Sequence, residues 1–385
     1  MERGEPAPPR RLAAATRALR RGTFASLSLG QFRLLLGGTA SSQVASWMEI
    51  VARGWLVLEL THSPFQLGLF EFIRGLTSLA VSPIAGVVSD RLDRRIVAGV
   101  SQVVPALAAL TIGLLVVTDT IALWHLYLVT GIVGVSSTFN FTARQVLVYD
   151  VVGPDYITNA IALHSVTANV ARIGAPSVGG VIVASAGVGD AYFAQAAFFL
   201  LATVATLALR PYTRAEPVRV PMWQGMRDGA GYVRRDPVLR RLVLLNAIPN
   251  LLIYPYVALM PFFAEDVLNV GSTGYGVLLS AVGFGSIPGG LIAASMTGSQ
   301  RKGRVMAGAA ILYMGMVALF GLSPWFPLSF ALLIAGGVGW SLMVTLNQTL
   351  LQLNVSDAYR GRVLAFYNMA SGITPFGSLA MGTAA

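Results

Sequence analysis

Long apolar windows dominate this chain and decide what it can fold into. Of its 385 residues, 55% are apolar and 11% are charged, whereas a soluble domain carries roughly 25% charged residues. The apolar residues fall into windows of about 20 or more, the length that crosses a hydrocarbon core of about 30 Å as a helix. Such helices satisfy their own backbone hydrogen bonds, which lipid cannot do. The sequence therefore predicts an all-α polytopic membrane protein.

Eleven segments have the length and hydropathy of membrane-spanning helices. We expect them at 33–59, 65–88, 96–117, 121–143, 158–185, 189–209, 241–264, 274–297, 304–322, 326–348 and 361–385. The only long connection separates the first six from the other five. The predicted organisation is therefore a basic tail that ends in a short surface helix (1–30), an N-terminal six-helix half (31–209), a linker with an amphipathic helix at Tyr232–Leu239 (210–240), and a C-terminal half (241–385).

The basic residues gather on one side of this layout. Of the 27 Lys and Arg, 24 lie in the tail, the linker and the connections on that side, Arg144 after the fourth span among them. The five short connections on the other side hold none. The positive-inside rule therefore places the N-terminus and the linker in the cytoplasm. Topology and contact with anionic lipid account for the net charge of +10, so we expect no nucleic-acid partner.

Several kinds of chemistry are excluded by residue type. The chain has no cysteine, and its tail lacks the apolar core of a cleavable signal peptide. Its only lysine, Lys302, follows an arginine, so no phosphate-binding loop of a nucleotide-driven pump is present. The three histidines (His62, His125 and His164) lack metal-ligand spacing, and no Gly-x-Ser-x-Gly occurs. We expect no enzyme activity, no metal and no cofactor.

A weak internal repeat supports the division into halves. The pattern Thr-x-Asn-x-Thr-x-x-Gln at 138–145 recurs at 345–352. An Asn and a Pro seven residues apart occur in the fifth span (Asn169, Pro176) and again in the eleventh (Asn368, Pro375). Parallel repeats of six helices are one known transporter plan.

The loop between the second and third spans carries the most specific motif. Gly86, Asp90, Arg91, Arg94 and Arg95 stand in the order G-x-x-x-D-R-x-x-R-R. Alone, the motif is also compatible with an ordinary positive-inside loop. In this position it resembles the loop signature of the major facilitator superfamily.

That resemblance implies two six-helix halves that rock about a midplane site. It also implies that Asp90 holds a cytoplasmic gate by docking near Gly361 and Arg362 on the eleventh helix. A twelfth helix belongs to this plan, so we expect the second half to be truncated in helix eleven.

Further stretches are similar to the drug and siderophore exporter branch of the superfamily, the enterobactin exporters included. They are 55–61 (WLVLELT), 159–163 (NAIAL) and 360–363 (RGRV). The fifth span adds a helix-packing motif of Gly174, Pro176, Gly179 and Gly180, similar to the Gly-Pro-x-x-Gly-Gly element of proton-coupled exporters, with Ala175 where that element has Gly. The alternative is an ordinary kinked helix whose glycines allow close packing.

Five ionisable residues lie well within the spans, where charge is costly and marks function by default. They are Glu49, Arg53, Glu71, Arg74 and Arg172. Counted from the short loop between spans one and two, Arg53 and Glu71 are each about seven residues deep, and Glu49 and Arg74 about ten or eleven. A neutral network of these four charges is therefore predicted, either as a structural brace or with Glu49 as the proton-coupling carboxylate. Asp90 is the rival proton site.

Arg172 has no acidic residue at its depth in its own helix. It is either a structural cation satisfied by backbone and water, or a contact for substrate. Other cavity candidates are Asn140, Asn169, Asn246, Asn250 and Tyr254, although Tyr near an interface is often an aromatic anchor.

The function that the sequence favours is proton-coupled efflux of amphipathic small molecules by alternating access, in a bacterial inner membrane. The expected partners are a small-molecule substrate, protons and lipid, and the chain is expected to be monomeric. The alternative is a proton-coupled importer of a polar or anionic solute. A non-transporting sensor and a channel are less favoured, because the architecture works by rocking halves around a central site.

Overall fold

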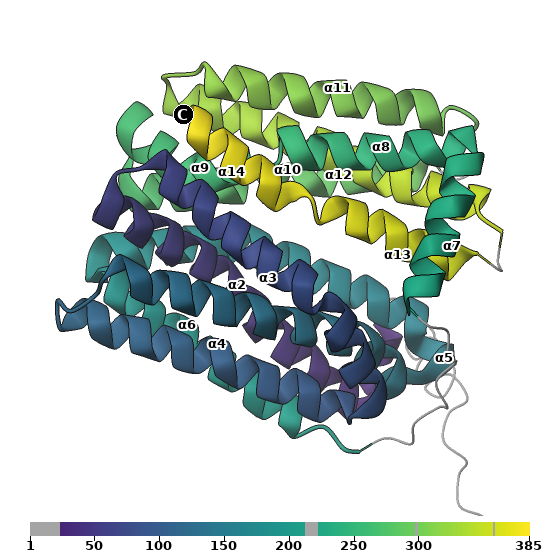
Figure 1. Ribbon diagram of the computed structural model, residues 1–385, viewed down its shortest axis with the longest axis horizontal. Coiled ribbons are helices and arrows are strands. Elements are labelled where there is room, and N and C mark those ends of the chain that lie inside the picture. Colours follow the sequence, from purple (N-terminus) through teal and green to yellow (C-terminus); the bar gives the residue numbers. More distant parts are fainter. Residues whose placement is uncertain (1–23, 212–221, 297–298, 357–358) are drawn as a thin grey trace, which may run out of the picture.

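The computed structural model describes residues 24–211, 222–296, 299–356 and 359–385. All regular elements within these residues are helices, so the all-α prediction is confirmed. Figure 1 shows two helical bundles packed side by side. The N-terminal half comprises η1 (Ala25–Ser28), α2 (Gly30–Thr61), α3 (Pro64–Arg91), α4 (Arg94–Val117), α5 (Leu123–Ala186) and α6 (Val188–Leu207). The C-terminal half comprises α7 (Met222–Arg235), α8 (Pro237–Leu252), α9 (Tyr256–Phe262), the π-helix η2 (Phe263–Val267), α10 (Gly271–Ser295), α11 (Lys302–Gly321), α12 (Phe326–Asn354), α13 (Arg360–Ser371) and α14 (Thr374–Ala384).

Eight helices of the described chain are long and apolar enough to cross a membrane. One of them, α5, has 64 residues and covers two predicted spans, with a non-helical Gly153 (φ 69°) between them. The charged and polar residues of α2 lower its hydropathy, and α13 and α14 are each too short for a span on their own. With α2 and the α13–α14 pair added, the eleven predicted spans are all accounted for.

Two predicted spans are each broken into shorter helices. The seventh is interrupted between α8 and α9 next to Pro255, and the eleventh between α13 and α14 two residues before Pro375. Proline lacks the backbone N–H that continues a helix and clashes with the preceding turn. Both breaks therefore lie next to a proline. The sequence analysis predicted continuous spans at these two places, because the apolar windows continue through each break.

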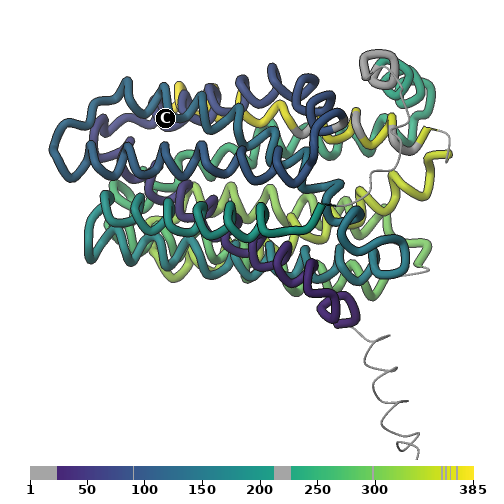
Figure 2. Tube along the Cα trace, turned by 90° about the horizontal axis from the view of Figure 1, so that it is seen from below, coloured from purple at the N-terminus to yellow at the C-terminus, as the bar shows by residue number. Residues whose placement is uncertain are grey.

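The surface helix of the linker lies earlier than expected. Instead of Tyr232–Leu239, it is α7, and the chain bends at Asp236 before α8. The Asp236 carboxylate accepts hydrogen bonds from the backbone of Val238 (2.7 Å) and Leu239 (3.2 Å), as an N-cap of a new helix does. In Figure 2, α7 and the purple start of the described chain, η1, lie toward the same end of the molecule, opposite the C-terminus.

The two halves meet along α3 with α14 and along α5 with α10. A Cβ on Gly75 of α3 would lie 1.8 Å from Pro375 of α14, and one on Gly276 of α10 would lie 2.3 Å from the Pro176 carbonyl of α5. We call these two contacts the interhalf seam. Pro176 and Pro375 are the prolines that the sequence repeat relates, so the seam has an approximate two-fold symmetry.

Candidate functional site

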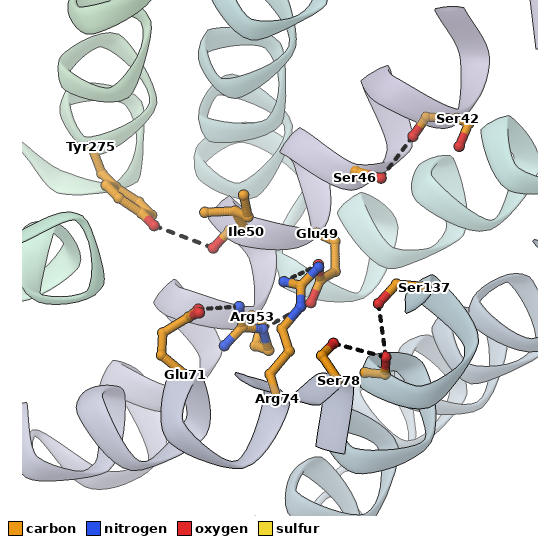
Figure 3. Close-up of polar contacts among 11 residues, drawn as sticks. Ser42, Ser46, Glu49, Ile50, Arg53, Glu71, Arg74, Ser78, Ser137 and Tyr275 are labelled. Carbon is orange, nitrogen blue, oxygen red and sulfur yellow. Dashed lines mark hydrogen bonds and ion pairs between the residues drawn. The ribbon is translucent and has the colours of Figure 1, made fainter. Parts of the chain in front are cut away.

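Four of the predicted intramembrane charges form one chain of ion pairs between α2 and α3 (Figure 3). Glu71 Oε1 accepts from Arg53 Nη2 at 2.5 Å, and Arg53 Nε donates to Glu49 Oε1 at 2.8 Å. The second oxygen of Glu49 accepts from Arg74 Nη1 at 2.9 Å. We call this set the charge chain. Charge-assisted hydrogen bonds of this length are the strong ones in proteins.

The α2 residues of the charge chain are more deeply buried than its α3 residues. Glu49 and Arg53 on α2 are buried, with 7% and 6% of their surface exposed. The side chains of Glu71 and Arg74 on α3 keep 32% and 24% exposure. The charge chain therefore has a buried middle, Arg53 and Glu49, and two partly exposed ends, Glu71 and Arg74.

Arg53, Glu71 and Arg74 also line a cavity of about 100 Å³ between the halves. The C-terminal half contributes Tyr254 and Tyr275 to its wall. We call this space the interhalf cavity. Glu49 instead borders a second cavity of about 20 Å³ inside the N-terminal half, together with Thr130, Tyr192 and Gln195.

Tyr275 is a site residue that the sequence did not single out. It is 1% exposed, and its hydroxyl donates to the backbone carbonyl of Ile50 at 3.2 Å, one residue from Glu49 (Figure 3). A Cβ on Gly54 would lie 2.9 Å from that hydroxyl. Gly54 was the one available signal, because a glycine beside a buried charge indicates close approach of another helix without saying which.

Arg172 lies apart from the charge chain. Its Nη2 donates to Asn169 Oδ1 at 3.0 Å, and its Nε is enclosed without a hydrogen-bond partner in the described structure. Tyr254 and Tyr256 of the C-terminal half are close enough to interact with it electrostatically. Arg172 and Asn169 belong to α5 of the N-terminal half, and Tyr254 lines the interhalf cavity from the C-terminal half.

Three of the predicted cavity residues form hydrogen bonds within their own half of the protein. Asn140 donates to the Ala98 carbonyl of α4 at 3.0 Å. Asn246 donates to the Tyr367 carbonyl at 3.4 Å, and Asn250 to the Asn246 carbonyl at 2.8 Å. An amide in apolar surroundings must satisfy its hydrogen bonds locally, and here helix carbonyls do so.

The loop motif joins the start of α4 to α5 and to the end of α6. Arg94 forms a buried ion pair with Asp150 of α5 at 2.8 Å, a partner that the sequence analysis missed. Arg95 Nη1 donates at 2.6 Å to the Leu209 carbonyl just beyond α6, where the helix dipole favours a cation. Arg91 is exposed, and Gly86 lies within α3.

The expected docking of Asp90 on the eleventh helix cannot be followed, because the side chains of Asp90 and of 360–361 lie outside the described residues. The neighbouring Arg362 pairs with Asp228 of α7 at 3.1 Å.

Only some residues of the packing motif in the fifth span contact the C-terminal half. A Cβ on Gly180 would lie 2.4 Å from the Ser272 carbonyl of α10, so this glycine is needed for the close approach of the halves. Gly179 faces Met48 of α2 at an ordinary 3.5 Å, and Gly174 has nothing within 4 Å. Pro176 belongs to the interhalf seam.

Arg144 was counted among the basic residues of the connections, but it lies within α5 and is buried. It is 7% exposed inside the N-terminal half, where it donates to Thr39 Oγ1 at 2.6 Å and to Thr206 Oγ1 at 3.2 Å. Among the described residues it has no carboxylate partner. Counting charges along the sequence could not reveal this burial, because Arg144 directly follows the predicted fourth span and can belong either to that helix or to the connection after it.

Solved transporters share this architecture. The chain superposes on a bacterial homologue of the human lysosomal transporter Spinster in an inward-facing, unoccupied conformation (TM-score 0.72, 16% identity, 92% of this chain and 81% of that one). It also resembles the nucleoside transporter NupG (TM-score 0.71, 13% identity, 92% and 90%) and an inward-facing bacterial homologue of the iron transporter ferroportin (TM-score 0.68, 13% identity, 92% and 91%). The chain thus has the multi-pass helical fold of this class of transporters.

Within that class, residues 21–385 match the transmembrane secretion effector family, and the chain belongs to it. Similar curated proteins include the staphyloferrin A transporter of Staphylococcus aureus (23% identity over 89% of this chain and 86% of that protein). Others are the multidrug efflux pump Tap of Mycolicibacterium fortuitum (24%, 92% and 88%) and the enterobactin exporter EntS of Shigella flexneri (24%, 83% and 78%). The predicted resemblance to drug and siderophore exporters is confirmed at the level of the family.

Proposed function

We propose that this chain is a proton-coupled exporter of amphipathic small molecules that works by alternating access, with Glu49 as the proton-coupling carboxylate. The single observation that carries the proposal is the charge chain. It leads from a buried carboxylate to two cations and a second carboxylate on the wall of the interhalf cavity. A purely structural brace would not need to border a cavity between the halves.

Protonation of Glu49 would change the cavity through Arg74. Both oxygens of Glu49 are engaged, one by Arg53 and the other by Arg74. A neutral carboxyl group holds a guanidinium far less tightly than a carboxylate does. Arg74 would therefore be released toward the interhalf cavity, and a positive charge would appear there when a proton binds. Coupling of proton movement to substrate movement requires that protonation at one place changes the charge at the place where substrate binds.

Proton access to Glu49 is supported by the second cavity. Its volume of about 20 Å³ is enough for one water molecule. Gln195, on its wall, has a buried Oε1 without a hydrogen-bond partner in the described structure, which suits a water donor. A proton could then reach Glu49 from inside the N-terminal half, by a route separate from that of the substrate.

Alternating access is supported by where the halves touch. The interhalf seam and the Gly54–Tyr275 contact lie toward the end where α2 joins α3 and α5 joins α6. With the N-terminus and α7 in the cytoplasm, as the positive-inside rule predicts for a bacterial inner membrane, this end faces outward. The structure would then be closed to the outside, like the two inward-facing transporters that it resembles.

Export, rather than import, is supported by relatives named as an efflux pump and an enterobactin exporter. The first test measures uptake of fluorescein, ethidium and Nile red into inverted vesicles that contain the wild type or Glu49→Gln, with and without an imposed proton gradient. The quantity compared is the factor by which the proton gradient accelerates uptake. For at least one dye, we expect this factor to be at least tenfold larger for the wild type than for Glu49→Gln.

Glu59→Gln is the matched control, because Glu59 lies on the same helix, is exposed, and bonds Trp55 (2.6 Å) instead of an arginine. It should keep its response to the proton gradient. The assignment of Glu49 fails if Glu49→Gln transports with unchanged dependence on the gradient. Uptake only by right-side-out vesicles would favour the importer alternative.

A further inference from the structure

All intramembrane charge of this transporter lies in one half. Glu49, Glu71, Arg53, Arg74 and Arg172 belong to α2, α3 and α5 of the N-terminal half. The spans of the C-terminal half contain no Asp, Glu, Lys or Arg over 242–264, 267–300, 305–356 and 363–385. The charge chain is neutral, so Arg172 leaves the region between the halves with one uncompensated positive charge.

The hydrogen-bonding capacity of Arg172 is mostly unused. A guanidinium has five N–H donors, and within the described residues the hydrogen-bond partner of this one is the neutral amide oxygen of Asn169. The two carboxylates within the spans, Glu49 and Glu71, are engaged by Arg53 and Arg74. A cation at membrane depth needs an anion or water to offset its desolvation, and no acidic side chain of the C-terminal half can supply it.

An aromatic cluster of the C-terminal half lies within electrostatic range of Arg172. Tyr254 interacts with Arg172 electrostatically and packs on Trp340, with ring centroids 5.3 Å apart. Trp340 in turn packs on Tyr313 at 5.1 Å. The buried hydroxyl of Tyr313 has no hydrogen-bond partner in the described part of the chain. This aromatic wall offers flat, apolar contact area to a ring and carries no charge of its own.

We propose that Arg172 is the anion-binding residue of the substrate site, and that the substrates are amphipathic monoanions with an aromatic body. The anionic group, a carboxylate or its equivalent, would take the free donors of Arg172 beside Asn169. The aromatic body would pack against Tyr254 and Trp340 across the gap. This inference rests on the proposed transport function, and it narrows the class of substrate.

The test is a binding measurement with two probes of equal shape. We would titrate 2-naphthoate and its neutral analogue 2-naphthamide into the purified full chain in detergent, by equilibrium dialysis. The wild type should bind the anion at least tenfold more tightly, because a charge-assisted, bidentate contact is available to the carboxylate alone. Arg172→Gln should abolish this preference, and Arg172→Lys should retain part of it.

A tyrosine variant separates the two parts of the site. Tyr254→Leu should weaken both probes by a similar factor and leave their ratio unchanged, since it removes ring contact and not charge. Arg53→Gln is unsuitable as a control because it breaks the charge chain. Glu59→Gln, outside the site, should bind both probes like the wild type.

The inference is overturned if Arg172→Gln keeps the wild-type preference for 2-naphthoate, or if the wild type binds neither probe or both equally. Binding in detergent requires no proton gradient and no transport, so the result is independent of the vesicle assay. A protein that binds both probes equally but still carries dyes in a Glu49-dependent way would refute the anion site and leave the proposed function intact.

Discussion

Arg144 shows how a buried cation can be held without an acid. Its guanidinium bonds the hydroxyls of Thr39 on α2 and Thr206 on α6, and each of these hydroxyls in turn donates to a carbonyl of its own helix. One side chain of α5 thus joins three helices of the N-terminal half. Removing one partner of a buried charge is more costly than removing the charge itself.

We therefore predict that Thr39→Val lowers the free energy of unfolding by about 1.5–3 kcal/mol, the worth of a hydrogen bond to a charged group. The measurement is the thermal unfolding of the purified protein in detergent. The same substitution in an Arg144→Met background should cost less than half as much, because no buried charge is then left without its partner. Equal costs in the two backgrounds would show that the hydroxyl does not support Arg144.

Residue-level prediction succeeded where depth alone decided the outcome. Arg53 with Glu71 and Glu49 with Arg74 were matched by counting from one short loop, and the structure pairs them in that way. It did not give the orientation around a helix, as for Asn140, which bonds the Ala98 carbonyl of α4. The contact of Tyr275 with α2 depends on how two distant helices cross, and no local pattern encodes this.

Among the elements, α7 is attached to the C-terminal half by several weak contacts. Asp228 pairs with Arg362 at 3.1 Å, and Tyr232 stacks on Tyr359 at 4.6 Å. Gly229 lets the helix approach so closely that a Cβ there would lie 2.5 Å from the Arg362 carbonyl. The half-exposed ion pair is worth at most about 1 kcal/mol, so shape at Gly229 matters more than charge.

Two alanine substitutions in α7 should therefore act in opposite directions. Gly231→Ala, where nothing lies within 4 Å, should slow amide hydrogen exchange in α7, because alanine favours a helix over glycine by about 1 kcal/mol. Gly229→Ala should accelerate it despite the same gain, because the helix must move off α13. The measurement is hydrogen exchange by mass spectrometry in lipid nanodiscs. Slower exchange in both variants would mean that α7 does not dock through Gly229.

Helix boundaries were predictable where chemistry marks them and not elsewhere. The apolar windows located every span, because length and hydropathy are local properties. The fusion of two spans into α5 was not foreseen, since residues 144–157 read as a loop from their polarity. They are helical on both sides of Gly153, whose positive φ absorbs the change of direction.

For the whole molecule, the interhalf seam is the feature that transport must break. Across it, Ser177 of α5 and Ser280 of α10 have their hydroxyl oxygens 2.7 Å apart. The natural chain has no cysteine, so introduced pairs can be read without interference. We predict that Ser177→Cys with Ser280→Cys forms a disulfide that stops dye uptake by inverted vesicles, and that reduction restores it.

The matched control joins two helices of a single half. Ser78 of α3 and Thr138 of α5 are hydrogen-bonded at 2.9 Å, so Ser78→Cys with Thr138→Cys should also cross-link but leave uptake unchanged. If the pair across the seam cross-links fully and uptake continues, the two halves do not separate at this end during transport.

The confinement of charge to one half also determines how the transporter responds to voltage. Over 242–264, 267–300, 305–356 and 363–385 the C-terminal half has no Asp, Glu, Lys or Arg, so these segments carry no side-chain charge through the membrane field when they move. The electrical work of one transport cycle is then determined by the transported species. A proton that enters and a monoanion that leaves both move positive charge inward. At about 2.3 kcal/mol per elementary charge per 100 mV, an interior-negative membrane potential would drive such an exchange even when the pH is equal on both sides.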